Sequence, residues 1–261
     1  NIDPQSVEQG VAVSKKQGLK PKAIIAVDLF GQPVDYPALE KIADDHDLWI
    51  LADAAQSFGA TLHGKKVGTL ALATATSFFP AKPLGCYGDG GAVFTDDDKL
   101  AEILKSIRVH GKGQHKYDNV RIGLNARLDT IQAAILLEKL KIFDDELRER
   151  QQIVKHYNEA LRDVVQVPSL IDGATSAWAQ YTVKLNQQDM DRSKIMHDLK
   201  EKGIPTMVYY EKPLHLQGAY KGFPKAGELT ISEECSRKVL SLPMNLLEKN
   251  IVCNLFQGCI A

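Results

Sequence analysis

The sequence predicts an α/β protein in which a mostly parallel sheet with helical crossovers is followed by a smaller α+β unit. Short apolar runs alternate with amphipathic segments through the first 110 residues, and a turn or a polar residue follows each run. From about residue 152 this alternation gives way to a less regular pattern. Apolar runs of this kind are typical of strands in a parallel sheet. We therefore expect two domains, a large one over 1–151 that includes a long helix and a small one over 152–261.

The first half of the chain supplies the expected sheet. Asp3 and Pro4 have the residue types of an N-cap and a first helical position, which predicts a helix over 4–16. The run over 23–29 predicts a buried strand, and the segment 37–46 predicts a helix. One side of that helix carries Leu39, Ile42 and Ala43. The remaining elements are strands ending at Asp53 and Ser77, a strand over 91–95 and a helix over 98–108.

A long helix is expected to begin after Asp129, which forms a pattern similar to a capping box with Gln132. Its apolar positions recur as one buried face requires, which favours packing within the domain or a dimer contact. These positions are Ile131, Ile135, Leu136, Leu140, Phe143 and Leu147. The second half then predicts a strand over 178–185, a helix from its N-cap Asp191 to Lys202, a strand over 206–210 and a helix over 232–240.

Composition excludes several classes of protein. The chain has 32 Lys and Arg against 33 Asp and Glu, so its net charge of −1 gives no general reason to bind nucleic acid. The basic residues over 107–116 form a small local patch without the spacing of a P-loop. The four cysteines form no CxxC pair, which argues against a disulfide scaffold or a metal site. No apolar run reaches the length of a membrane span, and we expect a cytoplasmic protein with reduced thiols.

Lys82 is the only cation between Thr74 and Phe94, and it lies between Pro80 and Pro83. The prolines exclude a helix and restrict the backbone, and a glycine-rich turn follows. An amine on a rigid loop among aromatic and small residues is poorly solvated, which favours its neutral, nucleophilic form. Such a lysine suits imine chemistry with a carbonyl, for which pyridoxal phosphate is the commonest partner. Taken alone, the residue is far more typical of a lysine that simply reaches solvent.

Asp53 directly follows the apolar run over 48–51. A carboxylate there lies at the carboxyl end of a strand, where open α/β sheets bind their ligands. A carboxylate that faces a pyridine nitrogen keeps that nitrogen protonated and makes the ring an electron sink. Taken alone, Asp53 is more typical of a turn or capping residue. Ser77, five residues before Lys82, has a hydroxyl that can donate to a phosphate.

Five segments in this order resemble one family, the pyridoxal-phosphate-dependent nucleotide-sugar aminotransferases of the DegT/DnrJ/StrS group. The segments are VDLFGQP (27–33), DAAQSFGA (53–60), TSFFPAKPLGCYGDGGA (76–92), GLNARLDTIQAAIL (123–136) and GIPTMVYYEKPLHLQ (203–217). The resemblance runs from the first residues to about Met244 and implies the aspartate aminotransferase fold, fold type I. The stretch around Lys82 and the tract WAQYTV (178–183) are most similar to enzymes that aminate a UDP-linked 3-keto sugar, often a uronic acid.

The resemblance assigns cofactor roles residue by residue. Lys82 matches the lysine that holds pyridoxal phosphate and moves the proton between Cα and C4′. Asp53 matches the partner of the pyridinium nitrogen, Gln56 the amide near the ring hydroxyl, and Ser77 a phosphate ligand. Asn125 matches an asparagine that reaches the phosphate from the neighbouring subunit, which implies a homodimer with shared active sites. From its own sequence, Asn125 is equally a turn residue before the helix.

On the substrate side, Arg127 matches a position for an anionic part of the sugar nucleotide, and Tyr210 and His215 match further substrate positions. His215 taken alone is more typical of a packed histidine. The family reaction moves an amino group from L-glutamate to a keto group of a nucleotide-linked sugar, in surface polysaccharide or glycoconjugate synthesis. No metal, nucleic acid or membrane is expected to take part.

The chain also departs from the family pattern. Members carry a further N-terminal stretch with a Gly-Thr phosphate loop and an aromatic residue that stacks on the cofactor, whereas this chain begins at Asn1. After Met244 the family usually continues with His-Pro, which is missing. We therefore expect an N-terminally truncated chain with an atypical tail, whose activity belongs to the parent protein. The alternatives are an inert fragment or non-catalytic relative, and a Rossmann-type protein, which the lack of GxGxxG disfavours.

Overall fold

The computed structural model describes residues 1–115, 117–186, 190–244 and 249–260. Lys116, part of the predicted basic patch, lies outside these residues, as do positions 245–248 and 261 of the tail. The chain forms two compact units. The first comprises Asn1–Ile2, Lys22–Asp144 and Asp172–Ala177, and the second comprises Asp3–Pro21, Asp145–Ile171 and Trp178–Ala261. The division into domains over 1–151 and 152–261 stays a prediction.

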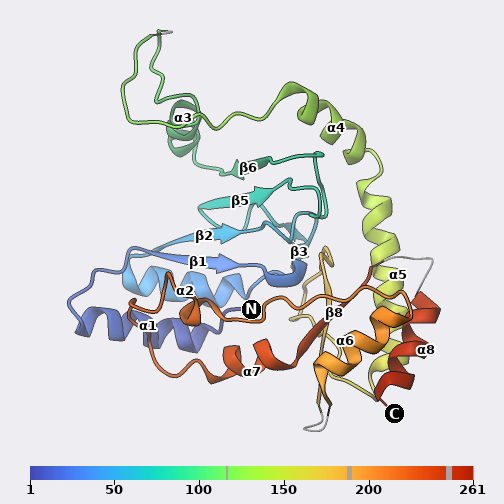
Figure 1. Cartoon of the computed structure of the whole chain (residues 1–261). Coiled ribbons are helices and arrows are strands. Elements are labelled where there is room, and N and C mark those ends of the chain that lie inside the picture. Colours follow the sequence, from blue (N-terminus) through green and yellow to red (C-terminus); the bar gives the residue numbers. More distant parts are fainter. Residues whose placement is uncertain (116, 187–189, 245–248, 261) are drawn as a thin grey trace. The chain divides into compact units, whose positions relative to one another are not determined.

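The first unit contains a four-stranded sheet in the order β1-β2-β5-β6 (Figure 1). Strands β1, β2 and β5 run parallel, and β6 pairs antiparallel with β5. The prediction of a mostly parallel sheet in an α/β unit is confirmed. The strands of this unit, including a short β3–β4 hairpin, are β1 (Ala23–Val27), β2 (Trp49–Asp53), β3 (Thr61–Leu62), β4 (Lys65–Lys66), β5 (Ala73–Ser77) and β6 (Gly91–Phe94).

Helix α2 (Tyr36–His46) covers one face of this sheet and packs on β2. Its predicted apolar side is correct, because Leu39, Ile42 and Ala43 are all buried. The prediction of a fully buried first strand is wrong for the opposite face, where Ile25 is 61% exposed and Val27 40% exposed. The strand therefore alternates between a buried and an open side, which a run of apolar letters cannot distinguish from burial on both sides.

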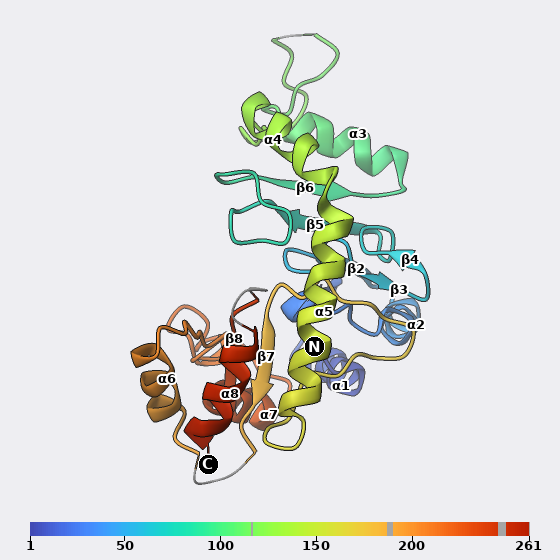
Figure 2. The same cartoon turned by 90° about the vertical axis from the view of Figure 1, so that its right-hand side faces the viewer.

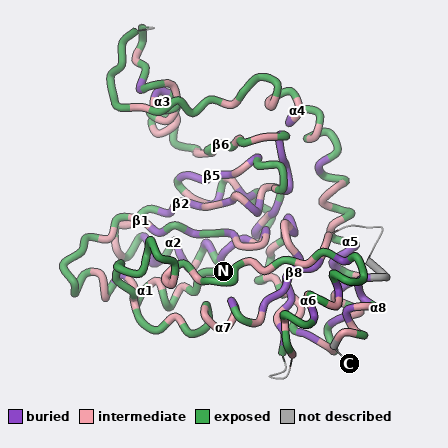
Figure 3. Tube along the Cα trace, viewed as in Figure 1, coloured by how far each residue is buried: buried purple, intermediate pink, exposed green. Residues whose placement is uncertain are grey.

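The predicted long helix is two helices, α4 (Thr130–Leu140) and α5 (Phe143–Leu161), separated by a turn at Lys141 and Ile142. Asp129 makes no side-chain capping bond, so the capping-box prediction is also wrong. Along the predicted apolar face, Leu136 is buried within this chain whereas Ile131 is 77% exposed, and the alternative of a dimer contact stays a prediction. A periodic apolar face is buried only where another element packs on it. In Figure 3, most of the described residues from α3 (Asp98–Ile107) to α4 have the green colour of exposed residues.

The second unit combines a two-stranded sheet with helices. Helix α1 (Pro4–Lys16) begins as predicted, since the Asp3 side chain accepts the Gln5 and Ser6 N–H groups. The predicted strand over 206–210 is wrong, because only Met207 forms an isolated bridge, to Ser241. Strand β7 pairs with β8, and the first two residues of β8, 239 and 240, had been predicted as the end of a helix. The elements are α6 (Arg192–Glu201), capped by Asp191 as predicted, β7 (Tyr181–Lys184), α7 (Thr230–Lys238) and β8 (Val239–Leu242).

The C-terminal tail forms helix α8 (Lys249–Ile260) and contributes to the core of the second unit. Its Val252, Cys253 and Phe256 are buried in one cluster with residues of α5, α6, β7 and β8. The Gln257 amide also donates to the Ala160 carbonyl of α5 at 2.7 Å. Figure 2 shows α5, α6 and α8 grouped with β7. The atypical tail is thus a structural element of this unit.

Two properties of the described residues bear on function. No group of three or more His, Cys, Asp or Glu side chains in the part of the chain that the structure describes is arranged to hold a metal ion. Among the same residues, no helix combines the length and apolar character that crossing a bilayer requires.

Candidate active site

Polar residues gather where the parallel strands of the first unit end. Asp28 follows β1, Asp53 is the last residue of β2, and Ser77 is the last residue of β5. Asp53 pairs in register with Ala75, and Ser77 lies two residues further along the same strand. Because side chains alternate along a strand, Asp53 and Ser77 lie on the same side of the sheet. That side is the open one, which also carries Val27.

Lys82 lies in the tight loop that joins β5 to β6. Its backbone N–H donates to the Phe79 carbonyl at 2.9 Å, and Cys86 and Gly90 each bond the backbone of Phe78 at 2.8 Å. Gly85 closes the loop, since a Cβ there would lie 2.7 Å from the Pro80 oxygen. The Lys82 side chain is half-buried, and its Nζ has no hydrogen-bond or ion-pair partner in the described residues. The loop is therefore firmly shaped while the amine stays available.

Ser77 and Asp53 each keep a polar group available for a ligand. Ser77 Oγ accepts the Phe79 N–H at 3.2 Å, which leaves its hydroxyl hydrogen to donate elsewhere. Beside Ser77 in the sheet lies Gly91, so no side chain covers the hydroxyl from that strand. One oxygen of the Asp53 carboxylate accepts the Ala55 N–H at 3.0 Å. This bond orients the carboxylate and leaves its second oxygen for another donor.

Gln56 is 7% exposed, and its Oε1 accepts the Phe30 N–H at 2.6 Å. Because only an oxygen can accept from a backbone N–H, this bond fixes the orientation of the amide and leaves Nε2 as its donor end. Phe30 adopts a φ of 62°, a left-handed conformation that is strained for an aromatic residue. The neighbouring structure thus holds both residues in place.

Asp28 is a buried residue of this region that the sequence analysis missed. Its carboxylate accepts the Ser57 hydroxyl at 2.7 Å, the Val34 N–H at 2.9 Å and the Tyr36 hydroxyl at 3.1 Å. Burial raises the pKa of Asp28 to about 6 against the effect of these bonds, and the negative charge of Asp53 adds to the rise. The available signal was a charged residue directly after an apolar run, in the segment VDLFGQP.

Asn125 and Arg127 lie apart from this group in the described contacts. Both are exposed, and Arg127 Nε donates to Asn125 Oδ1 at 3.2 Å. The backbone of Asn125 forms a bridge with Val109, at the end of α3. None of their described hydrogen bonds reaches Asp53, Ser77 or Lys82. The structure thus brings the two residues to each other and presents both to solvent.

Tyr210 and His215 belong to the second unit. His215 Nε2 lies 3.0 Å from Glu233 Oε1, and its side chain is 10% exposed. The bond to His215 lowers the pKa of Glu233. Tyr210 is 56% exposed and meets the ring of Tyr209 edge-on. His215 is thus both packed and oriented by a carboxylate.

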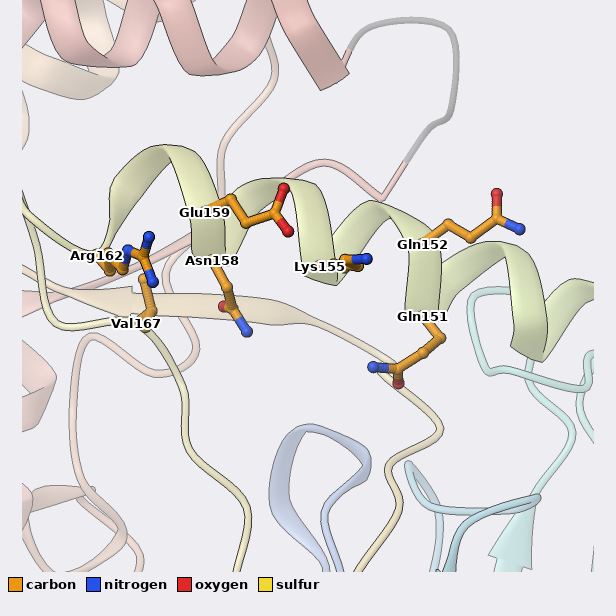
Figure 4. Close-up of a pocket in the computed structure, with 7 residues that line it drawn as sticks. All are labelled: Gln151, Gln152, Lys155, Asn158, Glu159, Arg162 and Val167. Atoms are coloured by element: carbon orange, nitrogen blue, oxygen red, sulfur yellow. The ribbon is translucent and has the colours of Figure 1, made fainter.

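A surface groove runs along α5 in the second unit and contains none of the predicted site residues (Figure 4). Two of its polar side chains serve the core, since Gln151 accepts the indole N–H of Trp178 and Asn158 accepts the Tyr181 hydroxyl, each at 2.8 Å. The groove is lined by Gln151, Gln152, Lys155, Asn158, Glu159, Arg162 and Val167.

Three comparisons relate the chain to known proteins. Residues 1–250 match the model of the DegT/DnrJ/EryC1/StrS aminotransferase family. A UDP-2-acetamido-2-deoxy-3-oxo-D-glucuronate aminotransferase of Pseudomonas aeruginosa is 42% identical over 94% of this chain and 65% of its own length. A dTDP-3-amino-3,4,6-trideoxy-alpha-D-glucose transaminase of Streptomyces venezuelae is 37% identical over 93% of this chain and 62% of its own.

A solved structure shows that the fold is also matched. A crystal structure of a DegT DnrJ EryC1 StrS aminotransferase from Brucella abortus has a TM-score of 0.95 and 47% identity, and it covers 100% of this chain and 70% of its own. The chain spans less than two thirds of the length of both curated relatives above. The family expected from the five segments is confirmed, and with it the fold class. The chain belongs to the DegT/DnrJ/EryC1/StrS aminotransferase family.

Proposed function

We propose that the whole protein is a pyridoxal-phosphate-dependent aminotransferase, which moves an amino group from L-glutamate to a keto group of a nucleotide-linked sugar. One observation carries the proposal. The available amine of Lys82 lies on a tight loop directly after the strand that ends in Ser77, and the adjacent strand ends in Asp53. Binding at the carboxyl edge of a parallel sheet is the general rule for α/β folds.

The donor and acceptor groups at this edge fit pyridoxal phosphate. The Ser77 hydroxyl hydrogen suits a phosphate oxygen, and the open oxygen of Asp53 suits a protonated ring nitrogen. Gln56 offers Nε2 to a ring hydroxyl because its Oε1 is occupied by Phe30. Lys82 offers the amine that a carbonyl cofactor needs. When bound, the cofactor supplies an electron-withdrawing ring that stabilises negative charge on the carbon bearing the nitrogen.

The residues of the chain then have distinct tasks. The Asp53 carboxylate holds a proton on the nitrogen that faces it, because a negative charge favours the protonated partner. Lys82 Nζ is the base that can move a proton at the reacting carbon, since it is the amine of the loop and is otherwise unbonded in the described residues. The tight backbone around Gly85 fixes where that amine can reach.

The substrate class follows from the relatives. The name of the Pseudomonas aeruginosa relative specifies a UDP-linked 3-oxo sugar acid, and that of the Streptomyces venezuelae relative a dTDP-linked 3-amino sugar. Both names place the nitrogen chemistry at C3 of a nucleotide-linked sugar. We take a UDP-linked 3-keto hexose or hexuronate as the substrate, with Arg127 as the group for its anionic part and Tyr210 and His215 on the substrate side. The product would enter polysaccharide or glycoconjugate synthesis.

A homodimer in which Asn125 reaches the phosphate of the partner's site is part of the proposal. Asn125 and Arg127 are exposed, and the adjacent apolar side chains Ile122 and Leu124 are 98% and 64% exposed. Apolar surface of this kind, next to exposed polar groups, is typical of protein interfaces. A second copy of the chain would remove it from water.

Replacing Lys82 tests the proposal directly. In the whole protein, Lys82→Ala should abolish the yellow absorbance of the bound cofactor, its fixation by borohydride and the half-reaction with glutamate, because the required amine is gone. Lys65→Ala is the matched control, since Lys65 lies exposed on the β3–β4 hairpin. Turnover of Lys82→Ala at the wild-type rate would exclude this assignment.

A further inference from the structure

We propose that Asp28 is a positioning residue, which fixes the Gln56 amide and thereby the polar lining of the cofactor site. The inference rests on the proposed function for the identity of the ligand, but its structural part stands on the contacts of Asp28 alone. Asp28 touches neither Lys82 nor any ligand group in the described contacts. It acts through the two segments that it joins, the turn over 29–34 and the loop over 54–57.

The Asp28 carboxylate connects these two segments directly. Its Oδ2 accepts the Ser57 hydroxyl of the loop at 2.7 Å, and its Oδ1 accepts the Val34 N–H at the end of the turn at 2.9 Å. A third bond, from the Tyr36 hydroxyl, comes from the first residue of α2. All of these partners are buried, with exposed fractions of 0% for Val34 and Ser57 and 1% for Tyr36. Water therefore has no access to replace the carboxylate.

Gln56 connects the same two segments a second time. It is the residue before Ser57, and its Oε1 accepts the Phe30 N–H within the turn. The length of that bond depends on the spacing between turn and loop, which Asp28 sets. Side chains that hold a binding group in place commonly act in this indirect way.

The turn has several other anchors, whereas the loop is bonded to β5 at its start, Ala54, and to Asp28 at its end, Ser57. Ser176 donates its hydroxyl and Ala177 its N–H to the Gly31 carbonyl, each at 2.9 Å. Asn1 also bonds the backbone of this turn, at Leu29 and Gln32. Loss of Asp28 should therefore leave the turn and the start of the loop in place and release the end of the loop at Gln56 and Ser57. The first consequence is a misplaced Gln56.

Hydrogen exchange of the Phe30 amide tests this positioning without any cofactor. In the apo protein, Asp28→Ala and Ser57→Ala should both speed this exchange by about tenfold, which is the effect of losing one net hydrogen bond. Asp28→Asn should keep the wild-type rate, because an Asn oxygen accepts from Val34 and Tyr36 and its amide can donate to Ser57 Oγ. Wild-type exchange in Ser57→Ala would overturn the proposal, even if Asp28→Ala does not fold.

Titration with pyridoxal phosphate tests the consequence for the site. Ser57→Ala and Asp28→Ala should raise the Kd by about tenfold, and Asp28→Asn should restore the wild-type value. Asp35→Asn is the matched control, since Asp35 caps α2 from an exposed position in the same segment. If Asp28→Asn raises the Kd as much as Asp28→Ala does, the charge of Asp28 acts directly on the cofactor. That result would contradict a positioning role.

A double-mutant cycle separates action through Gln56 from general loosening. In a Gln56→Ala background, Ser57→Ala should have no further effect on the Kd. Additive effects of the two changes would contradict the proposal. If the wild-type protein binds no pyridoxal phosphate, the proposed function fails, while the exchange of the Phe30 amide still decides whether Asp28 positions Gln56.

Discussion

Replacing Asp28 with Asn should stabilise the protein at neutral and higher pH. Asp28 is 0% exposed, and its pKa is raised from 3.8 to about 6. The folded state therefore binds its proton more tightly than the unfolded state does. Stability from this group is fully present below pH 3.8 and is lost as the pH rises through about 6, where the buried side chain becomes charged.

The size of the effect follows from the shift. A rise of about two pKa units, at 1.36 kcal/mol per unit, corresponds to about 3 kcal/mol at pH 8 and to about half of that at pH 5. Asp28→Asn has no charge to bury and keeps the three hydrogen-bond positions of the carboxylate. The variant should therefore exceed the wild-type free energy of unfolding by about 3 kcal/mol at pH 8 and by about half as much at pH 5.

Urea denaturation followed by circular dichroism at pH 5 and pH 8 measures this difference. At an unchanged slope of about 3 kcal/mol/M, a difference of about 3 kcal/mol corresponds to a midpoint shift of about 1 M. Other carboxylates with shifted pKa values, such as Glu233 and Glu234, contribute equally to both proteins and cancel in the comparison. A difference that does not grow between pH 5 and pH 8 would refute the reasoning, because Asp28 would then carry no buried charge.

Three further changes test the proposed site. Asp53→Asn should slow the chemical step by about 10² or more while the cofactor still binds, because the charge beside the ring nitrogen is lost; an unchanged single-turnover rate would place the carboxylate elsewhere. Gly85→Ala should displace the loop, since the new Cβ would lie 2.7 Å from the Pro80 oxygen, and borohydride fixation of the cofactor reports the displacement. Mixing the inactive variants Lys82→Ala and Asn125→Asp should restore activity if active sites are shared between subunits, because one site of each mixed dimer then carries neither defect. A mixture that stays inactive after verified subunit exchange argues against shared sites.

Local signals in the sequence were sufficient for elements whose ends are set by their own residues. Asp3 and Asp191 cap the helices that they were predicted to begin, because a capping side chain bonds N–H groups two or three residues away. The strands that end at Asp53 and Ser77 were also predicted correctly. The family followed from short segments in a fixed order, and the comparisons confirm it.

Predictions that depended on distant partners were less successful. Residues 239–242 form β8 because they pair with β7, more than fifty positions earlier in the chain, and a helical pattern in 232–240 gave no sign of it. The apolar stripe that includes Ile131 was expected to pack within the domain or in a dimer contact, and within this chain Ile131 is 77% exposed. Burial is a property of the neighbouring element, which periodicity within one helix cannot supply.

The sequence by itself determined the family, the order of most elements and the residues proposed to hold the cofactor. Only the tertiary structure decided which of these residues are brought together and which polar groups remain available. Asp28 illustrates the reason, because it accepts hydrogen bonds from residues six, eight and twenty-nine positions away, and no local pattern in the sequence announces that set. The orientation of the Gln56 amide likewise depends on Phe30, twenty-six positions earlier. Such contacts exist only once strands that are distant in sequence lie side by side in the sheet.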